Sequence, residues 1–120
     1  MHEIGIADSI LQAVRVEAAR HPCARPVRVG MRIGELAGVD PEALRFCLEI
    51  LTDGTDLEHL QLEIEVCRRQ HRCAACKSDF LVSGYDFRCP TCGGESKEFT
   101  GGDQLEFSYL EMEEYESSTA

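Results

Sequence analysis

Four cysteines in the second half of the chain have the spacing of a metal site. They form two pairs, Cys73-Ala-Ala-Cys76 and Cys89-Pro-Thr-Cys92, separated by the twelve residues 77–88. Each pair can turn so that its two sulfurs face one ion, and two such turns complete a tetrahedron. Because thiolates would then occupy all four positions, no position is left for a catalytic water. The spacing therefore predicts one structural zinc ion, held by the four thiolates.

Two other interpretations of these cysteines stay open on the sequence alone. One is a rubredoxin-like iron site with an electron-transfer function, because the pattern Cys-Pro-x-Cys-Gly, here ending at Gly93, also occurs around iron. Lys77 rather than a glycine follows the first pair, and nothing else in the sequence supports electron transfer. The other interpretation is two unrelated pairs of reduced thiols. Zinc is the interpretation that the spacing favours most.

The residues around the two pairs predict a small module that depends on its metal. The module spans residues 68–97 and contains too few apolar side chains for a core that folds alone. The metal is therefore expected to supply most of its stability. The apolar side chains expected to form two short arms over the ion are Phe80, Val82, Tyr85 and Phe87. His71, close to Cys73 in the sequence, can contact the same module.

A histidine at position 2 is the second feature with metal chemistry. The amine of Met1, the backbone nitrogen of His2 and its ring nitrogen can together bind one ion in fused chelate rings. This nitrogen-rich, planar or tetragonal geometry suits nickel(II) or copper(II). Glu3 can add its backbone nitrogen or its carboxylate. The alternative interpretation is an exposed histidine without a ligand role, on a frayed terminus.

The charge of the chain argues against nucleic acid as a partner. The net charge is −10, whereas proteins that bind nucleic acid usually present a basic face. Residues 68–97 are the exception, with six basic residues against three acidic ones. These cations either offset the charge of a tetrathiolate zinc site, about −2, or form a patch that binds a partner. A zinc-ribbon module for protein or nucleic-acid interaction is therefore the alternative function.

The cysteine count and the lack of long apolar runs predict a cytoplasmic protein without a membrane span. Seven cysteines cannot all pair within one chain, so metal ligands or reduced thiols are expected before disulfides. No run of eighteen apolar residues occurs, and the amino terminus lacks the pattern of a signal peptide. Outside the quartet, Cys47 falls on an apolar helix stripe as a buried thiol, Cys67 continues a strand, and Cys23 has no assigned role.

Two amphipathic helices are predicted in the first half of the chain. Apolar residues recur at helical spacing from Ile4 to residue 20, and Pro22 predicts the end of this helix. The second helix starts with Asp40 as N-cap and Pro41 at its first position, and Gly54 follows its end. Its apolar stripe comprises Leu44, Cys47, Leu48 and Leu51.

Three segments have the alternating pattern of half-buried strands. Apolar and polar residues alternate over 27–33, 62–66 and 105–109. Two helices and three strands each need a partner for their apolar face. The predicted fold is therefore α+β, with two helices packed on a three-stranded sheet.

The cysteine-rich segment lies between the second and third of these strands, so it is predicted to be an inserted zinc ribbon rather than a tail. The predicted domains are 1–67 plus 98–120, which form an α+β domain, and 68–97, the zinc-ribbon module. The acidic residues from Glu111 to the end of the chain are expected to fray.

Three motifs taken together extend over nearly the whole chain. Met1-His2-Glu3 opens a helix, residues 28–39 contain a Gly34-Glu35-Leu36 turn, and a Cys-x-x-Cys pair comes late. With these motifs the chain resembles the HypA/HybF family, whose members insert nickel during the maturation of nickel–iron hydrogenases. Each motif alone is weak, and the combination is specific.

The resemblance implies a nickel metallochaperone with two metal sites and no enzymatic activity. The family's nickel motif corresponds to His2 and Glu3, and its structural zinc is held on four cysteines. Asp40 is a further candidate oxygen ligand for nickel, although as an N-cap it already has a structural role. The implied partners are a HypB-type maturation GTPase and the hydrogenase large subunit. The sequence contains no catalytic constellation or phosphate-binding loop, so the energy for delivery is expected to come from a partner.

Overall fold

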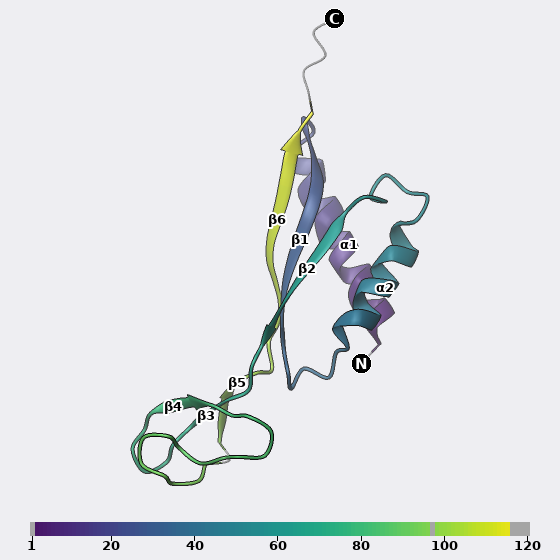
Figure 1. Ribbon diagram of the computed structural model, residues 1–120. Coiled ribbons are helices and arrows are strands. Elements are labelled where there is room, and N and C mark those ends of the chain that lie inside the picture. The colour runs from purple at the N-terminus through teal and green to yellow at the C-terminus, as the bar shows by residue number, and fades with distance from the viewer. Residues whose placement is uncertain (1, 97, 116–120) are drawn as a thin grey trace, which may run out of the picture. The chain divides into compact units, whose positions relative to one another are not determined.

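The computed structural model describes residues 2–96 and 98–115 of the 120-residue chain. In chain order the elements are α1 (Glu3–Arg20), β1 (Ala24–Gly34), α2 (Pro41–Thr52), β2 (Gln61–Cys67), β3 (Gln70–Arg72), β4 (Asp79–Leu81), β5 (Phe99–Gly101) and β6 (Leu105–Glu114) (Figure 1). The strands form two three-stranded sheets, ordered β2-β1-β6 and β4-β3-β5. The prediction of two helices, a three-stranded sheet and an inserted cysteine module is confirmed.

The chain divides into two compact units, which are described separately. Residues 1–31, 39–64 and 107–120 make up the first, called the helical unit because it contains both helices. Residues 32–38 and 65–106 make up the second, called the ribbon unit because it contains the four paired cysteines.

α1 forms over the predicted residues and packs one face into the core of the helical unit. The side chains of Ala7, Ile10, Leu11 and Val14 are buried, at the spacing of an amphipathic helix. Ile4 in the first turn is exposed instead, so the packed stripe begins at Ala7. The helix ends at Arg20, before Pro22, as the sequence predicts.

α2 begins and ends where its capping residues predict. The Asp40 carboxylate accepts hydrogen bonds from the backbone N–H groups of Glu42 (3.0 Å) and Ala43 (3.4 Å), and Pro41 opens the helix. Gly54 follows the helix with a φ of 74°, a left-handed conformation that glycine adopts without strain. α2 packs against α1. Neither of these helices is long and apolar enough to cross a membrane.

β1 is the central strand of the first sheet. Figure 1 shows β1 and β2 running in the same direction and β6 in the opposite one. The connection from β1 to β2 passes through α2, which is the kind of crossover that parallel neighbours require. Ion pairs fix β6 against β1, because Arg28 contacts Glu111 (2.8 Å) and Arg25 contacts Glu113 (3.4 Å). Val29 and Met31 of β1 are buried in the core of the helical unit.

Two glycines of β1 allow close approaches that a larger residue would prevent. A Cβ atom at Gly30 would overlap the ring of Tyr109 on β6, within the helical unit. A Cβ atom at Gly34 would overlap the backbone carbonyl of Gly102, within the ribbon unit. The first obstacle is a side chain and the second is backbone, so the second has less freedom to move aside.

The ribbon unit contains a small antiparallel sheet around β3. His71 of β3 is opposite Phe80 of β4 and Phe99 of β5. The expectation that the acidic segment frays from Glu111 on is wrong as far as Glu114, because β6 continues to that residue and its glutamates pair with arginines of β1. The last residues of the expected frayed segment, 116–120, lie outside the described residues.

Candidate metal centre

The structure brings the four predicted zinc ligands together in the ribbon unit. All of their Sγ atoms lie within 4.8 Å of one another. The Sγ atoms of Cys73 and Cys92 are 3.5 Å apart, and those of Cys76 and Cys89 are 3.6 Å apart. Four sulfurs bound tetrahedrally at about 2.3 Å from one zinc ion would be about 3.8 Å apart. The size of the cluster and its all-sulfur donor set therefore fit a tetrahedral zinc ion.

A tight turn presents the first pair of thiols. The N–H of Lys77 donates to the carbonyl of Cys73 (2.9 Å), and the N–H of Cys73 donates to the carbonyl of Ser78 (2.9 Å). The hydroxyl of Ser78 lies 2.9 Å from Sγ of Cys76 and 3.6 Å from Sγ of Cys89. Sequence reasoning misses Ser78, because a serine two residues after a cysteine pair has no distinctive spacing.

The second turn repeats the geometry of the first. The N–H of Gly93 donates to the carbonyl of Cys89 (2.8 Å), and the N–H of Cys89 donates to the carbonyl of Gly94 (2.7 Å). The residue after each pair has a left-handed backbone, with φ of 78° at Gly93 and 66° at Lys77. A lysine therefore occupies the conformation that glycine adopts in the other turn, at some cost in strain.

A small core packs behind the thiols. It consists of the buried side chains Cys73, Phe80, Val82 and Cys89, and Phe87 packs against it. The prediction that Tyr85 covers the metal is wrong, since its side chain is 92% exposed. Tyr85 lies in the turn closed by the bridge between Ser83 and Asp86, where the chain reverses and directs the side chain outward.

His71 is buried in the ribbon unit, next to two aromatic rings. Its ring stacks on Phe87 at a centroid distance of 5.4 Å and lies 6.1 Å from the ring of Phe80. Nδ1 is 2.7 Å from the carbonyl oxygen of Ser96. Because a carbonyl can only accept, Nδ1 carries the hydrogen and donates it. The structure thus places His71 inside the module, where it ties β3 to the segment that follows the second turn.

Hydrogen-bond donors near the cluster change the acidity of the thiols. The Ser78 hydroxyl lowers the pKa of Cys76. Burial raises the pKa of Cys89, but the backbone N–H of Cys92 and the Ser78 hydroxyl outweigh it and bring the pKa to about 6. The N–H of Gly94 lowers the pKa of Cys92, whereas the neighbouring sulfurs raise it to about 11. A divalent metal that replaces the thiol protons would remove this competition among adjacent sulfurs.

The basic residues of the ribbon unit have local partners of their own. They contact carboxylates, hydroxyls or carbonyls of the same unit: Arg72 with Asp79 (3.1 Å), Arg88 with Asp86 (2.9 Å), Arg68 with Ser83 (2.8 Å) and Arg69 with Gly84. Arg69 also stacks over the ring of Phe87 at 5.3 Å. Arg72 and Arg88 nevertheless keep half or more of their side-chain surface exposed, so both predicted roles of these cations stay predictions.

His2 immediately precedes α1 and is exposed. Its carbonyl accepts hydrogen bonds from the N–H groups of Gly5 (3.1 Å) and Ile6 (3.3 Å), while its side chain makes no capping bond. The first N–H groups of a helix have no partner inside the helix. The ring and backbone nitrogens of His2 are therefore accessible to a metal ion. Met1, whose amine is the predicted third nitrogen ligand, lies outside the described residues.

Glu3 connects the start of α1 to the start of α2. Its Oε1 accepts a hydrogen bond from the backbone N–H of Asp40 (3.2 Å). This bond is the main reason why the pKa of Glu3 is lowered, so the carboxylate stays charged. Figure 1 shows both helices starting at the same end of the helical unit. Glu3 therefore contacts the backbone of Asp40, whereas the Asp40 carboxylate caps α2. Among the described residues the side chains of His2, Glu3 and Asp40 do not come together as the four cysteines do.

The remaining three cysteines lie outside the four-thiol group. Cys23 is exposed, Cys67 is buried in β2, and Cys47 is only half-buried, so the prediction of a buried thiol at Cys47 is partly right.

Comparisons with known proteins connect this arrangement to nickel. A family model described as "Hydrogenase/urease nickel incorporation, metallochaperone, hypA" matches residues 1–112. The hydrogenase maturation factor HypA of Methanopyrus kandleri is 33% identical over an alignment 133 positions long, which covers 94% of each chain. The hydrogenase maturation factor HypA of Geotalea uraniireducens is 36% identical over 113 residues, which cover 94% of this chain and 100% of the relative.

Two solved structures share the fold. The solution structure of the Ni metallochaperone HypA from Helicobacter pylori matches with a TM-score of 0.61 at 21% identity, over 93% of this chain and 97% of that one. A second solution structure, of a HypA protein, matches with a TM-score of 0.67 at 23% identity, over 93% and 96%. At these identities the likeness shows the common fold.

Proposed function

The chain belongs to the HypA family of nickel-incorporating metallochaperones, and on that premise we propose that it binds nickel(II) at its amino terminus and delivers it for hydrogenase maturation. The proposed ligands are the amine of Met1, the nitrogens of His2 and a backbone nitrogen or the carboxylate of Glu3. Asp40 is a further candidate oxygen ligand. The four cysteines of the ribbon unit are proposed to hold a structural zinc ion, and no enzymatic step is part of the function.

The observation that carries the nickel proposal is the hydrogen bond between the Glu3 carboxylate and the Asp40 backbone. It supports a site at the start of α1 in which the Glu3 carboxylate, held by the backbone of Asp40, lies next in the chain to a nitrogen-rich chelate at His2. Nickel(II) prefers such nitrogen and oxygen donors in a tetragonal arrangement. The start of a helix disfavours a cation because of its dipole, and the charges of Glu3 and Asp40 oppose that effect.

The two proposed metals differ in how they are held, and that difference suits a carrier. Zinc in the ribbon unit would have four thiolates around it and no open position, which suits a permanent structural ion. Nickel at His2 would lie at an exposed helix start, where a partner can approach and remove it. The proposal places this exchange in the cytoplasm, where cysteine thiols stay reduced.

Delivery requires proteins that supply energy and accept the metal. We propose that these are a HypB-type maturation GTPase and the hydrogenase large subunit, the partners expected for a member of this family. The chain has no phosphate-binding loop sequence, so nucleotide hydrolysis would belong to the GTPase.

Titration of nickel into three proteins tests the proposal. These are the native chain, His2→Ala, and a chain with the four residues Gly-Ser-Gly-Ser added before Met1. One added residue would not serve, because the new amine, two amide nitrogens and the His2 ring would form another chelate for nickel. Both changes are expected to abolish tight nickel binding, the first by removing the ring and the second by converting the amine into an amide. The zinc content should stay the same in all three. Nickel binding by His2→Ala with the affinity of the native chain, at one site per chain, would show the proposed site to be wrong.

Elemental analysis tests the second metal separately. The purified protein is expected to contain about one zinc per chain and almost no iron, because four closely spaced thiols without an open position suit zinc. Iron as the main metal, with the absorption bands of an iron–thiolate centre, would favour the rubredoxin-like alternative instead.

A further inference from the structure

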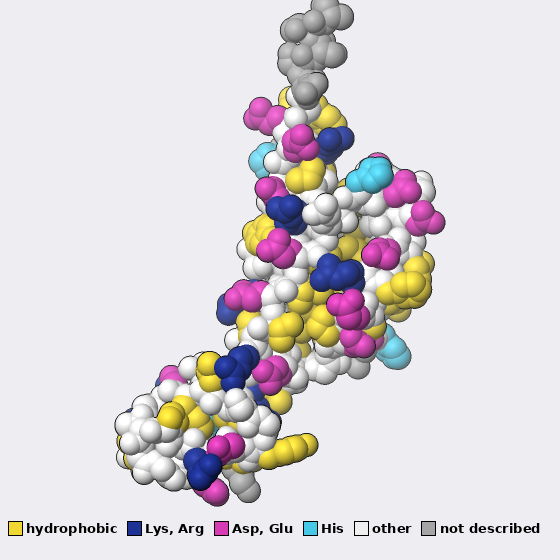
Figure 2. Space-filling view, in the orientation of Figure 1, with side chains coloured by type: hydrophobic (Ala, Val, Ile, Leu, Met, Phe, Trp, Pro, Cys, Tyr) yellow, Lys and Arg dark blue, Asp and Glu magenta, His cyan; other side chains and the backbone are white. Residues whose placement is uncertain are grey.

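The outward face of α2 carries two large apolar side chains in addition to its buried stripe. Phe46 is 61% exposed and Ile50 is 52% exposed, whereas Leu44 and Leu48 face the core. A surface helix normally places polar residues opposite its buried side. Figure 2 shows hydrophobic side chains gathered over α2, with Asp and Glu side chains around them. The apolar ridge of Phe46 and Ile50 therefore has no packing role within the helical unit.

The ridge borders a hollow that is lined by carboxylates without ion-pair partners among the described residues. The hollow, of about 350 Å³, is lined by Phe46 and Ile50 and by the carboxylates of Glu49, Asp53 and Glu58. None of these three carboxylates forms an ion pair within the described ranges 2–96 and 98–115. Most glutamates of the sheet differ, because they contact arginines of β1: Glu63 and Glu65 on β2, and Glu106, Glu111 and Glu113 on β6. The acidic residues at the hollow are thus available to cations from outside.

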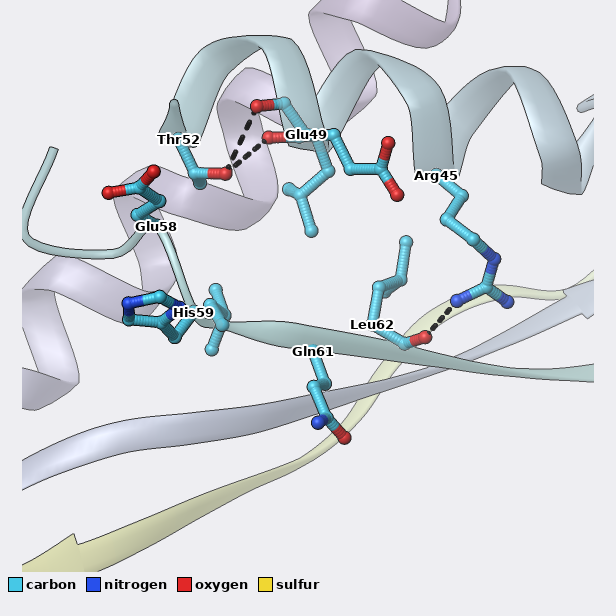
Figure 3. A pocket seen from close by; sticks show the side chains of 9 residues that line it. Arg45, Glu49, Thr52, Glu58, His59, Gln61 and Leu62 are labelled. Atoms are coloured by element: carbon cyan, nitrogen blue, oxygen red, sulfur yellow. Dashed lines mark hydrogen bonds between the residues drawn. The ribbon is translucent and has the colours of Figure 1, made fainter. Parts of the chain in front are cut away.

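A second hollow continues the first towards β2. It measures about 380 Å³ and shares Glu49 and Glu58 with the first. Figure 3 shows Arg45 at its far end, donating to the backbone carbonyl of Leu62 rather than to either carboxylate. Arg45, which lines this hollow, is therefore already bonded to β2, the edge strand of the sheet. Together the two hollows form one groove between α2 and residues 58–62, which we call the α2 groove.

We propose that the α2 groove docks a partner protein, through a segment in which an apolar side chain is flanked by Lys or Arg. Burial of that side chain against Phe46 and Ile50 would supply most of the affinity, since exposed apolar patches of this kind mark interaction sites. Lys or Arg beside it would meet the free carboxylates and set orientation and association rate. A nucleic acid or an anionic membrane would be repelled by the same carboxylates. A second copy of this chain, at a net charge of −10, is also disfavoured.

The position of the groove connects it to the proposed nickel site, and in this respect the inference rests on the proposed function. Phe46 comes six residues after Asp40 on the same helix, which is about 9 Å along the axis. The groove runs from Phe46 toward the end of α2, away from Asp40. A docked protein that extends past Phe46 toward the start of α2 would reach His2 and Glu3, where nickel is proposed to bind. The fitting partner is a protein that exchanges nickel with this chain.

Binding assays with purified partners test the proposal. The probes are the maturation GTPase and the hydrogenase large subunit, each titrated with the full zinc-loaded chain. Two groove variants, Phe46→Ser with Ile50→Ser and Glu49→Lys with Glu58→Lys, are expected to weaken binding of at least one probe by about tenfold or more. Binding should also weaken as salt is raised. The matched controls are Val16→Ser, which removes an apolar side chain that is 56% exposed on α1, and Glu114→Lys on β6.

The possible outcomes distinguish failure of the docking proposal from failure of the nickel proposal. Unchanged affinity of both probes for both groove variants would overturn the docking proposal, and so would control variants that weaken binding equally. Self-association of the native chain that the groove variants abolish would also overturn it, in favour of a second copy. Nickel titration of the same variants should give the native affinity. Native chain that binds a probe but no nickel would refute the proposed function and leave the groove intact.

Discussion

The helical unit buries mostly aliphatic side chains from two helices and a sheet, whereas the ribbon unit buries two of its own metal-site thiols. The buried set of the helical unit comprises Ala7, Ile10, Leu11, Val14, Val29, Met31, Leu44, Leu48, Leu57 and Leu62. In the ribbon unit the core around the cluster has four members, and Cys73 and Cys89 are two of them. One unit is thus stabilised by apolar burial, and the other is expected to depend on a metal bound by its thiols.

This difference would let one chain hold the two proposed metals in different ways. A metal that completes a core cannot leave without unfolding that core, so the ribbon unit suits a resident ion. A metal at the exposed start of α1 can leave without loss of packing, because His2 contributes nothing to the core. Whether a proposed metal stays bound or can leave therefore depends on whether its ligands are part of a core.

The largest effect is expected when the metal site is destroyed. Replacing both buried thiols, Cys73→Ser with Cys89→Ser, should unfold the ribbon unit, since structural zinc contributes about 10–16 kcal/mol in zinc-finger peptides. Amide signals of residues 68–96 should lose their dispersion in an NMR spectrum, while the far-UV circular dichroism of the helices persists. Loss of the helical signal as well would show that the two units are one cooperative structure.

The reciprocal change in the helical unit is Leu44→Ala. Leu44 is fully buried in α2, and removal of its side chain should cost about 2–5 kcal/mol through lost burial and the cavity left behind. Thermal unfolding followed by circular dichroism should shift to a lower temperature, while zinc stays bound as measured with a chromogenic chelator. Zinc release at the same temperature as helix unfolding would contradict the independence of the two units.

Gly30 and Gly34 of β1 allow the two units to be compared within one strand, since Gly30 belongs to the helical unit and Gly34 to the ribbon unit. Gly34→Ala should destabilise by about 1–3 kcal/mol, because the added Cβ meets the backbone of Gly102. Gly30→Ala should cost about 1 kcal/mol or less, because the half-exposed ring of Tyr109 can turn aside. Urea denaturation of the two variants gives the comparison. An equal or reversed order of the two effects would mean that the sheet yields more readily around Gly34.

The smallest effect on stability is expected at Asp40, where two roles can be told apart. Asp40→Ala should cost about 1 kcal/mol through the lost cap, and Asp40→Asn should cost almost nothing, since asparagine caps a helix as well as aspartate. If Asp40 binds nickel, the Asn variant should lower nickel affinity at unchanged stability. Denaturation and nickel titration on the same samples decide. Native nickel affinity in Asp40→Asn would leave Asp40 with its capping role alone.

Much of the fold could be predicted because its signals are local. Capping by Asp40, the break at Pro22 and the strand at residues 27–33 each depend on a few neighbouring residues, and the structure confirms them. Burial along β1 does not alternate as predicted, since residues 29–31 are all buried. The cysteine spacing predicted the four-thiol cluster for a similar reason, since a turn that brings two thiols to one ion needs a fixed number of residues. Both turns indeed have matching hydrogen bonds and a left-handed residue after the pair.

The predictions that failed depend on contacts between distant residues. Tyr85 looks like the other aromatic residues of the ribbon, and only the turn at residues 83–86 directs it outward. The segment from Glu111 looks like a polar tail in the sequence, but it pairs with the distant strand β1, whose arginines contact its glutamates. The exposure of Phe46 and Ile50 was not predicted either. The pattern of α2 gave one apolar stripe for the core and no sign that two more apolar residues would face outward.

The most direct test of the account measures both metals in the same samples. The native chain, His2→Ala and the double variant Cys73→Ser with Cys89→Ser are loaded with nickel and zinc, desalted, and analysed by mass spectrometry for metal content. The account predicts about one of each metal in the native chain, zinc alone in His2→Ala, and nickel alone in the cysteine variant. Nickel retained by His2→Ala, or lost from the cysteine variant together with zinc, would contradict it.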